Sequence, residues 1–416
     1  MISGVMRIAA CLFLCLNLHG DDLSWPNWLG PNHDGSSDSF ALPVPTDGKD
    51  YSVDWSIKVG RGWASPVCDS KILILHERDG ESESLRALDP LTGKQRWRFA
   101  YRSGYQDSFG MEDGPRSTPA ISDGIVVSHG PQGLVHAVSA KDGALRWKVD
   151  LAEKFSSPKG FFGRCSSPLV VGERVMFDVG GQNAGMVALE LKTGKLAWSS
   201  TSYGNDYSSA VPFETNSGPV VLSFMREGFL ALNAKTGKEV FFERFRSPIN
   251  ASVNAASPLV IGNQVLLSSC YEVGAGFWAY EESSAGKGSF DAIWKKKNAL
   301  DCHYSTPVQR DGFAYGFHGR QERGPLLRCI SLKDGKVMWE APAMGAGNLL
   351  RAKGKLIVLT EDGELIVADA SPDRFRVLHR QQILGTGSRA HFALSNARLF
   401  ARDQRRLVCL RLEQFE

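Results

Sequence analysis

The sequence lacks the short motifs that mark several enzyme classes. It has no GxxxxGK[ST] phosphate loop, no GxGxxG dinucleotide fingerprint and no GxSxG nucleophile elbow, and its nine histidines lack zinc-like spacing. An excess of one charge is also missing, because 48 Lys and Arg face 45 Asp and Glu without a basic stripe interleaved with aromatics. We therefore assign no catalytic residue and no metal ligand, and we expect no nucleic-acid partner.

Cysteine is scarce and widely spaced. Two of the eight, Cys11 and Cys15, lie near the N-terminus, and the others show no CxxC and no adjacent pair: Cys68, Cys165, Cys270, Cys302, Cys329 and Cys409. Export would permit disulfides, and a pair between Cys165 and Cys302 stays open. Cys329 and Cys409 fall inside apolar strands, where they are expected to be small buried hydrophobic residues.

Long hydrophobic runs are absent after residue 20, so the mature chain is expected to have no transmembrane segment. Before that point a short apolar run follows Arg7 and ends near Gly20, which is typical of a secretory signal peptide. Ile8-Ala-Ala-Cys11 also resembles a lipoprotein box, so lipidation or an uncleaved anchor stays open. We expect residues 1–20 to be a signal peptide on a chain exported to the periplasm, the cell envelope or the exterior.

Against these absences stands one abundant feature, a repeat. Its copies occupy residues 87–97, 137–147, 188–198, 231–241 and 329–339. Each copy has an alternating apolar run, a polar turn with Gly at a fixed position, and an aromatic residue four places after that Gly. Self-similarity of this period indicates propeller blades or solenoid turns.

Counting the aromatic slots gives the number of blades. Four strands fit each repeat, but the last repeat ends at Glu416 without its aromatic strand, and residues 54–59 supply one at the other end of the chain. A ring completed by this N-terminal strand has no free edge. The slots are Trp55, Trp97, Trp147, Trp198, Phe241, Trp294, Trp339 and the pair Val377-Leu378. We predict an all-β, eight-bladed β-propeller of four-stranded blades over residues 51–416.

The slots are interpreted as structural docking positions. Gly takes a left-handed turn conformation that a Cβ would strain, and the aromatic ring is expected to lie between neighbouring blades. Residues 21–50 do not repeat; Trp25 and Trp28 predict an N-terminal clasp segment pinned to the propeller by its rings.

The Ala-x-Asp-x-x-Thr-Gly-x-x-x-Trp pattern resembles the tryptophan-docking repeat of the pyrrolo-quinoline quinone (PQQ)-type β-propellers, over essentially all of residues 51–416. The resemblance implies two functional branches. Quinoprotein dehydrogenases hold PQQ and calcium in a central funnel, under an adjacent Cys-Cys disulfide and over a Trp platform. Scaffolds similar to the outer-membrane assembly factor BamB share the eight blades without a cofactor. This chain has no adjacent cysteines, and only Asp206, Asp301 and Asn254 lie near the openings as calcium ligands.

Residues just before each Ser-x-Pro blade opening are expected to line the funnel, because the innermost strands begin there. The candidates are Trp63, Arg116, Arg164, Asp206, Tyr207, Asn254, His303, Tyr304 and Arg389. This polar, aromatic and mildly basic set suits a small or anionic ligand or a peptide loop, and the alternative is a water-filled funnel.

Two irregular segments, residues 274–280 and 101–111, carry aromatic side chains that either form a recognition surface or pack on their own blades. We predict a monomeric, non-catalytic scaffold that binds a protein or peptide through its loops and funnel mouth, with no cofactor. The alternative is a divergent quinoprotein oxidoreductase with PQQ and calcium in the funnel.

Overall fold

The computed structural model describes residues 24–46, 48–284 and 286–412. The predicted signal peptide lies outside these residues. Within them, no helix is both long and apolar enough to cross a bilayer. The two helical elements are a single turn each, α1 (Leu151–Lys154) and the 3-10 helix η1 (Gln321–Arg323).

The described residues form eight sheets, and the first four follow one another along the chain. The first contains β3 (Val67–Cys68), β4 (Leu73–Asp79), β5 (Ser82–Leu88) and β6 (Gln95–Arg102). The second contains β7 (Ala120–Ser122), β8 (Ile125–His129), β9 (Leu134–Ser139) and β10 (Leu145–Asp150). The third contains β11 (Leu169–Val171), β12 (Arg174–Gly181), β13 (Ala184–Glu190) and β14 (Leu196–Ser200). The fourth contains β15 (Val211–Thr215), β16 (Gly218–Phe224), β17 (Gly228–Asn233) and β18 (Glu239–Arg244).

The remaining four sheets continue this order and then return to the N-terminus. The fifth contains β19 (Leu259–Ile261), β20 (Gln264–Ser269), β21 (Gly274–Glu282) and β22 (Gly288–Lys296). The sixth contains β23 (Val308–Arg310), β24 (Phe313–His318), β25 (Leu326–Ser331) and β26 (Val337–Glu340). The seventh contains β27 (Gly347–Ala352), β28 (Lys355–Thr360), β29 (Glu364–Asp369) and β30 (Val377–Gln382), with β1 (Ser36–Ser37) added beside β27. The eighth contains β31 (Ala393–Ser395), β32 (Arg398–Arg402), β33 (Arg406–Arg411) and β2 (Ser52–Lys58).

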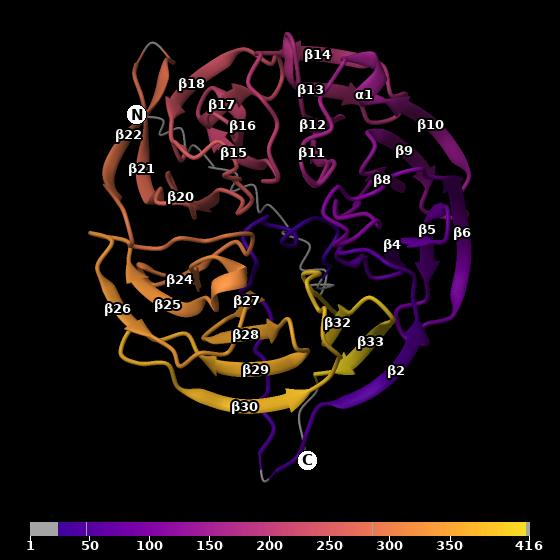
Figure 1. The fold of residues 1–416 in the computed structure, drawn as a ribbon, viewed down its shortest axis with the longest axis vertical. Coiled ribbons are helices and arrows are strands. Elements are labelled where there is room, and N and C mark those ends of the chain that lie inside the picture. Colours follow the sequence, from indigo (N-terminus) through magenta and orange to yellow (C-terminus); the bar gives the residue numbers. More distant parts are fainter. Residues whose placement is uncertain (1–23, 47, 285, 413–416) are drawn as a thin grey trace, which may run out of the picture.

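In six sheets the four strands form an antiparallel meander that runs in chain order from the centre to the rim (Figure 1). The seventh adds β1 inside such a meander, and in the eighth the N-terminal β2 takes the place of the last strand. The fold is therefore an all-β, eight-bladed propeller of four-stranded blades, as predicted. The seventh blade has a fifth strand that was not predicted, because β1 pairs parallel with β27 through Ser36↔Arg351 and Ser37↔Ala352.

The eighth sheet joins distant parts of the chain. β2 pairs antiparallel with β33, with Val53 opposite Leu410 and Trp55 opposite Cys409. Asp54 adds two ion pairs within this sheet. It accepts a hydrogen bond from Arg411 Nε of the adjacent β33 at 2.8 Å and from Arg398 Nε of β32 at 3.0 Å.

The aromatic slots touch the next blade. Six indole N–H groups donate to a backbone carbonyl there at 2.7–3.1 Å: Trp55 to Pro90, Trp97 to Ala140, Trp147 to Leu191, Trp198 to Ala234, Trp294 to Leu332 and Trp339 to Ser371. The turn glycine explains how the ring fits. At Gly194, with φ of +70°, an added Cβ would lie 2.7 Å from the Trp147 ring. In the fourth blade Phe241 has no N–H to donate, and it contacts the rings of Phe229 and Phe290 instead.

The Ser-x-Pro openings are linked around the centre. The backbone N–H of the middle residue donates to a hydroxyl in the next blade in five successive bonds of 2.9–3.3 Å: Ser65 to Thr118, Thr118 to Ser167, Ser167 to Ser209, Ser209 to Ser257 and Ser257 to Thr306. A hydroxyl is the acceptor at Thr118, Ser167, Ser209, Ser257 and Thr306, which explains the repetition of Ser and Thr at these five openings.

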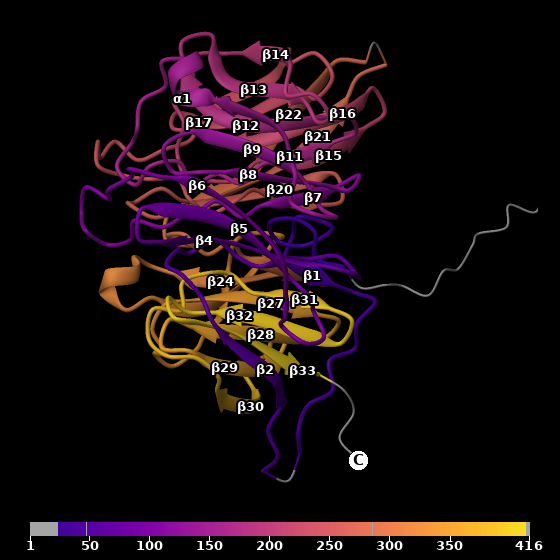
Figure 2. The same ribbon diagram turned by 90° about the vertical axis from the view of Figure 1, so that its right-hand side faces the viewer.

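The N-terminal segment lies across one end of the centre, toward the right-hand face in Figure 2, where β1 is also seen. Trp25 exchanges two backbone hydrogen bonds with Cys68 in the first blade, and Pro26 accepts from Ile121 in the second. Trp28 donates to Ser257 Oγ in the fifth blade and packs its ring against His391 in the eighth. A single segment thus contacts blades on several sides of the ring.

All six cysteines of the described residues are free, so the open pair between Cys165 and Cys302 is not formed. Cys329 and Cys409 are fully buried, as predicted. Residues 274–280 lie in β21, where the side chains of Phe277, Trp278 and Tyr280 are buried. Phe277 packs on Trp294 of its own blade, while Trp278 and Tyr280 pack against Phe229 and Phe213 of the fourth blade, so these aromatic side chains fill the core and do not form an exposed recognition surface.

Candidate functional site

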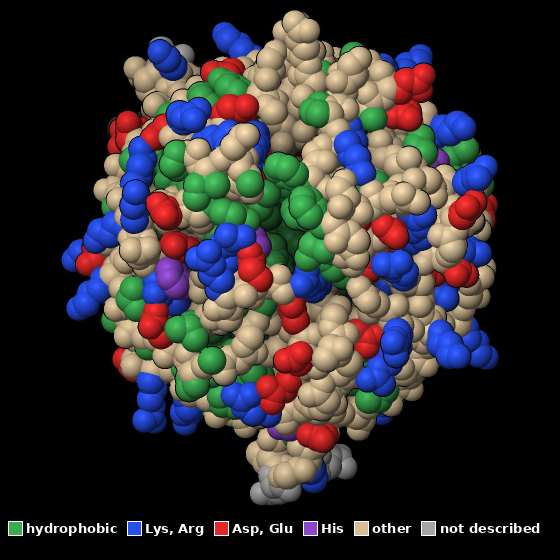
Figure 3. Space-filling model, viewed as in Figure 1, with side chains coloured by type: hydrophobic (Ala, Val, Ile, Leu, Met, Phe, Trp, Pro, Cys, Tyr) green, Lys and Arg blue, Asp and Glu red, His purple; other side chains and the backbone are tan. Residues whose placement is uncertain are grey.

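The candidate site is the hollow on the face shown in Figure 3, which we call the funnel mouth. It collects the connections from the outer strand of one blade to the inner strand of the next. Figure 3 shows hydrophobic side chains around a central hollow, with charged side chains beside it. Trp63, Arg116 and Arg389, each predicted from its place before an opening, are in contact there.

Trp63 is held between two cations. The guanidinium carbon of Arg116 lies 4.8 Å from the centroid of the indole, and that of Arg389 lies 4.7 Å from it. Both distances are within the range of cation–π attraction. The indole Nε1 is buried and has no hydrogen-bond partner within residues 24–412 as far as the structure describes them.

Arg116 is fully engaged by its own neighbours. It pairs with Asp107 at 2.8 Å and donates to the Phe162 carbonyl at 2.9 Å, and its side chain is only 8% exposed. Asp107 in turn accepts from three backbone N–H groups, those of Phe109, Met111 and Glu112. These contacts and the nearby guanidinium outweigh burial and lower the pKa of Asp107. Arg116 therefore braces the connection after β6.

Arg389 is engaged on one side only. Its Nε pairs with Glu361 at 2.9 Å, while Glu361 also accepts from the Tyr304 hydroxyl and from Gln321 Nε2, each at 2.8 Å. Burial, together with the neighbouring Glu361 carboxylate, raises the pKa of Tyr304, which therefore stays protonated as the donor. Arg389 Nη1 and Nη2 have no partner in the described part of the chain.

His303 is neutral and has an assigned tautomer. Its Nδ1 accepts from the Gln321 backbone N–H at 3.2 Å, so Nε2 carries the proton and donates to the Tyr271 hydroxyl oxygen at 2.9 Å. Burial lowers the pKa of His303 to about 4. Arg320 covers the Tyr271 ring at 4.7 Å, which adds a cation to this side of the mouth.

Three of the predicted funnel residues lie behind the surface. Arg164, Asp206 and Asn254 are each 2% exposed. Arg164 donates to Ser157 and Pro158, and Asp206 accepts from Arg226 and from the Asn254 backbone N–H. Because Asp206 is buried, its pKa is raised to about 7. These side chains support the wall and do not offer their charges to the mouth.

Four apolar side chains form what we call the aromatic rim: Phe109, Met111, Phe161 and Phe162. Phe109 is 59% exposed, Met111 41% and Phe161 39%. The Phe109 ring lies 5.3 Å from that of Phe162, and Phe162 lies 5.4 Å from Tyr207, whose hydroxyl accepts from the Phe161 backbone N–H at 2.7 Å. The segment 101–111 thus exposes part of its apolar surface instead of packing all of it on its own blade.

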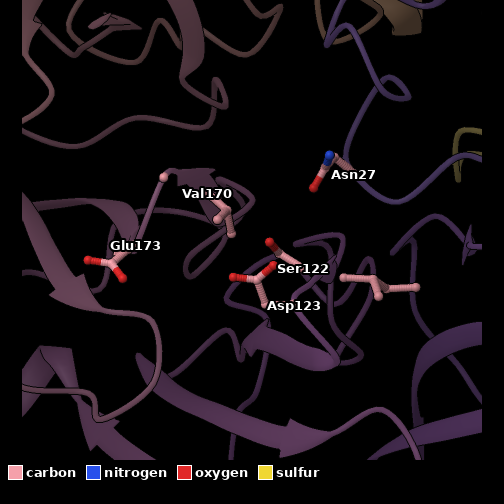
Figure 4. Close-up of a pocket in the computed structure, with 7 residues that line it drawn as sticks. Asn27, Ser122, Asp123, Val170 and Glu173 are labelled. Atoms are coloured by element: carbon pink, nitrogen blue, oxygen red, sulfur yellow. The ribbon is translucent and has the colours of Figure 1, made fainter. Parts of the chain in front are cut away.

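The opposite face carries a different pocket. It has a volume of about 470 Å³ and lies beside the N-terminal segment (Figure 4). Its lining residues are Asn27, Ile121, Ser122, Asp123, Val170, Gly172 and Glu173. None of the residues predicted from the blade openings belongs to this lining, so the two sites are separate.

The described residues do not fit the calcium ion and the disulfide that accompany the quinone in the quinoprotein branch. Within the described residues no group of three or more His, Cys, Asp or Glu side chains could hold a metal ion. Asp206 is engaged by Arg226, and its raised pKa disfavours the carboxylate that calcium prefers. Cys165 stands alone, because none of the six cysteines in the described residues is paired.

Sequence reasoning missed Asp107, Phe162, Tyr271 and Glu361. Glu361 lies in the turn between β28 and β29, and Tyr271 follows β20, so neither precedes an opening. Their blades carry no repeat signal at those positions. Only the irregular length of the connection after β6 pointed toward Asp107.

Comparison of the sequence with known proteins identifies a family and several curated relatives. A family model described as "Outer membrane protein assembly factor BamB" matches residues 81–315, more than half of the chain. BamB of Escherichia coli is 26% identical over 270 residues, covering 60% of this chain and 62% of that protein. Seven curated relatives, which also include a tetrathionate hydrolase and a quinohemoprotein alcohol dehydrogenase, are matched over 19–69% of their own length.

Two solved structures share the fold. BamB from Moraxella catarrhalis superposes with a TM-score of 0.64 at 15% identity, over 88% of this chain and 99% of that one. Quinohemoprotein alcohol dehydrogenase from Comamonas testosteroni gives 0.65 at 13% identity, over 95% and 81%. Because the family model covers more than half of its length, this chain belongs to the family described as outer membrane protein assembly factor BamB.

Proposed function

We propose that the protein is a non-catalytic scaffold that binds a protein partner at its funnel mouth. The observation that carries the proposal is the aromatic rim, where Phe109 and Phe161 are 59% and 39% exposed and their ring centroids lie 6.3 Å apart. Aromatic residues and Met are enriched where proteins meet, and such a cluster is stabilised when a partner covers it. The similarity to an outer membrane protein assembly factor supports the same role.

The proposal includes export to the periplasm or cell envelope and a monomeric state. The predicted signal peptide and the family's outer-membrane description support the location. Cell fractionation and light scattering test these two points, and a cytoplasmic chain or a stable dimer would contradict them.

Site-specific photocrosslinking tests the partner. A photoreactive phenylalanine analogue at Phe109 is expected to trap a cell-envelope protein in living cells. The same analogue at Leu91, which is 58% exposed at the far end of β5 and β6, is the matched control. Equal trapping at both positions, or none at Phe109, would refute the proposal.

The similarity to quinohemoprotein alcohol dehydrogenase supports a second candidate, an oxidoreductase that binds PQQ in the funnel. Trp63 between two guanidinium groups is the feature that favours it. It predicts saturable PQQ uptake that is lost on Trp63→Ala, and the absence of uptake at micromolar quinone dismisses it.

A further inference from the structure

A continuous row of side chains leads from the aromatic rim into the funnel mouth. The Phe109 ring lies 5.3 Å from the Phe162 ring, and the Arg116 guanidinium lies 5.7 Å from Phe162 and 4.8 Å from Trp63. Arg389 follows on the same indole at 4.7 Å. The row therefore begins with exposed apolar surface and ends at a cation.

Two residues at the inner end of this row, Arg389 and Trp63, have N–H donors without a hydrogen-bond partner in the described residues. Glu361 accepts from Tyr304 on one oxygen and from Gln321 on the other, and it forms an ion pair with Arg389, so both of its oxygens are occupied. Arg389 keeps two terminal nitrogens without a partner in the described residues, and Trp63 Nε1 is a buried donor in the same state. Unpaired donors of this kind suit a carboxylate, which a guanidinium can bind with two parallel hydrogen bonds.

The outer end of the row is also open toward an acidic ligand. Lys159 is exposed beside the aromatic rim, donates to the Gln106 carbonyl at 2.7 Å and lies 4.9 Å from the Tyr105 ring. Among the described residues it forms no ion pair with a carboxylate. Asp113, the half-buried acid of the connection after β6, is already close to Arg61 at 3.5 Å.

We propose that the funnel mouth binds a peptide segment in which an acidic side chain is adjacent to an aromatic or large aliphatic one. The apolar side chain lies on Phe109 and Phe161, and the carboxylate reaches the unpaired terminal nitrogens of Arg389. This inference rests on the proposed scaffold function and names the chemistry of the partner that the same surface selects. A basic segment is rejected, because it would leave Arg389 and Lys159 facing like charges.

Fluorescence anisotropy with labelled nonapeptides tests the inference. The probe is Gly-Ser-Phe-Asp-Gly-Phe-Asp-Ser-Gly, and two relatives carry Lys in place of Asp or Ala in place of Phe. At low ionic strength the full chain is expected to bind the probe with a micromolar dissociation constant and to bind each relative at least roughly tenfold more weakly.

Variants locate the binding on the protein. Arg389→Gln is expected to weaken binding of the probe by roughly tenfold or more, because the charge-assisted bidentate hydrogen bonds of the guanidinium are lost. Phe109→Ser is expected to weaken it by about fivefold or more, and the matched variant Leu91→Ser, on the far side of the blade, leaves it unchanged. Arg389→Lys keeps the charge near Glu361 and is expected to bind with intermediate strength. A circular dichroism melt shows that each variant is folded.

Three results would overturn the inference: equal binding of the Lys peptide, equal loss on Leu91→Ser, or no binding of the probe at about 1 mM. The scaffold proposal is judged separately. Photocrosslinking at Phe109 without binding of the probe would retain a protein partner and reject the acidic-aromatic chemistry.

Discussion

The docking contact of Trp147 allows a quantitative test of how the blades are held together. The ring is 8% exposed, its N–H donates to the Leu191 carbonyl at 2.8 Å, and it lies against Gly194 in the third blade. Burying a tryptophan removes roughly 200 Å² from water, which at about 25 cal/mol per Å² corresponds to about 5 kcal/mol as an upper value.

Trp147→Ala is therefore expected to lower the free energy of unfolding by roughly 3–5 kcal/mol, because the cavity between two blades cannot close fully. Trp147→Phe keeps most of the apolar contact but leaves the Leu191 carbonyl without its donor, and a loss of about 1–3 kcal/mol is expected. Urea unfolding followed by circular dichroism measures both, with midpoints compared at constant slope.

The control lies two residues away on the same strand. Leu145 is 47% exposed, and Leu145→Ala is expected to change stability by less than about 0.5 kcal/mol. If Trp147→Ala cost no more than Leu145→Ala, the ring would not be what joins the second blade to the third.

Two further perturbations address charge. Asp54→Asn removes both ion pairs that bind β2 to the last blade and should cost roughly 3 kcal/mol by thermal unfolding; Glu364→Gln, whose pair with Arg380 is more exposed, should cost less than about 1 kcal/mol, and equal losses would contradict the role of Asp54. Burial raises the pKa of Asp206 from its ordinary value of 3.8 to about 7, so its contribution to stability is present below pH 4 and is lost as the pH rises through 7. Relative to Asp206→Asn, the native chain should thus lose stability between about pH 4 and pH 7, by at most roughly 4 kcal/mol in urea titrations; parallel curves for the two proteins would refute this.

The blades were predictable from the sequence because the same short sequence pattern recurs in nearly every blade. An alternating strand, a turn that needs Gly, and an aromatic side chain at a fixed distance recur, so a single argument about Trp97 or Trp147 applies to the others. The Ser-x-Pro openings repeat for an equally physical reason, the hydroxyl that the preceding blade requires. The periodicity of the sequence was therefore sufficient to predict the eight-bladed fold.

The site was predictable only in part, because it is built where the repeat ends. The position of Trp63 and Arg389 before an opening indicated the mouth, but their contact depends on how the first and eighth blades meet. Glu361 arrives from a turn of the seventh blade and has no counterpart in the repeat. Arg164 and Asn254 satisfy the same rule of position, yet local hydrogen bonds turn them into the wall.

The pairing of β1 with β27 and of β2 with β33 has a consequence for biogenesis. Ser36 and Val53 are synthesised early, but their partners Arg351 and Leu410 are added more than 300 residues later. Contacts of such sequence separation are slow to form, and until then the edges of both strands stay exposed to other chains. The N-terminal strands must be kept from aggregating until β27 and β33 have been synthesised, and a chain truncated before β33 would leave β2 permanently without its native partner.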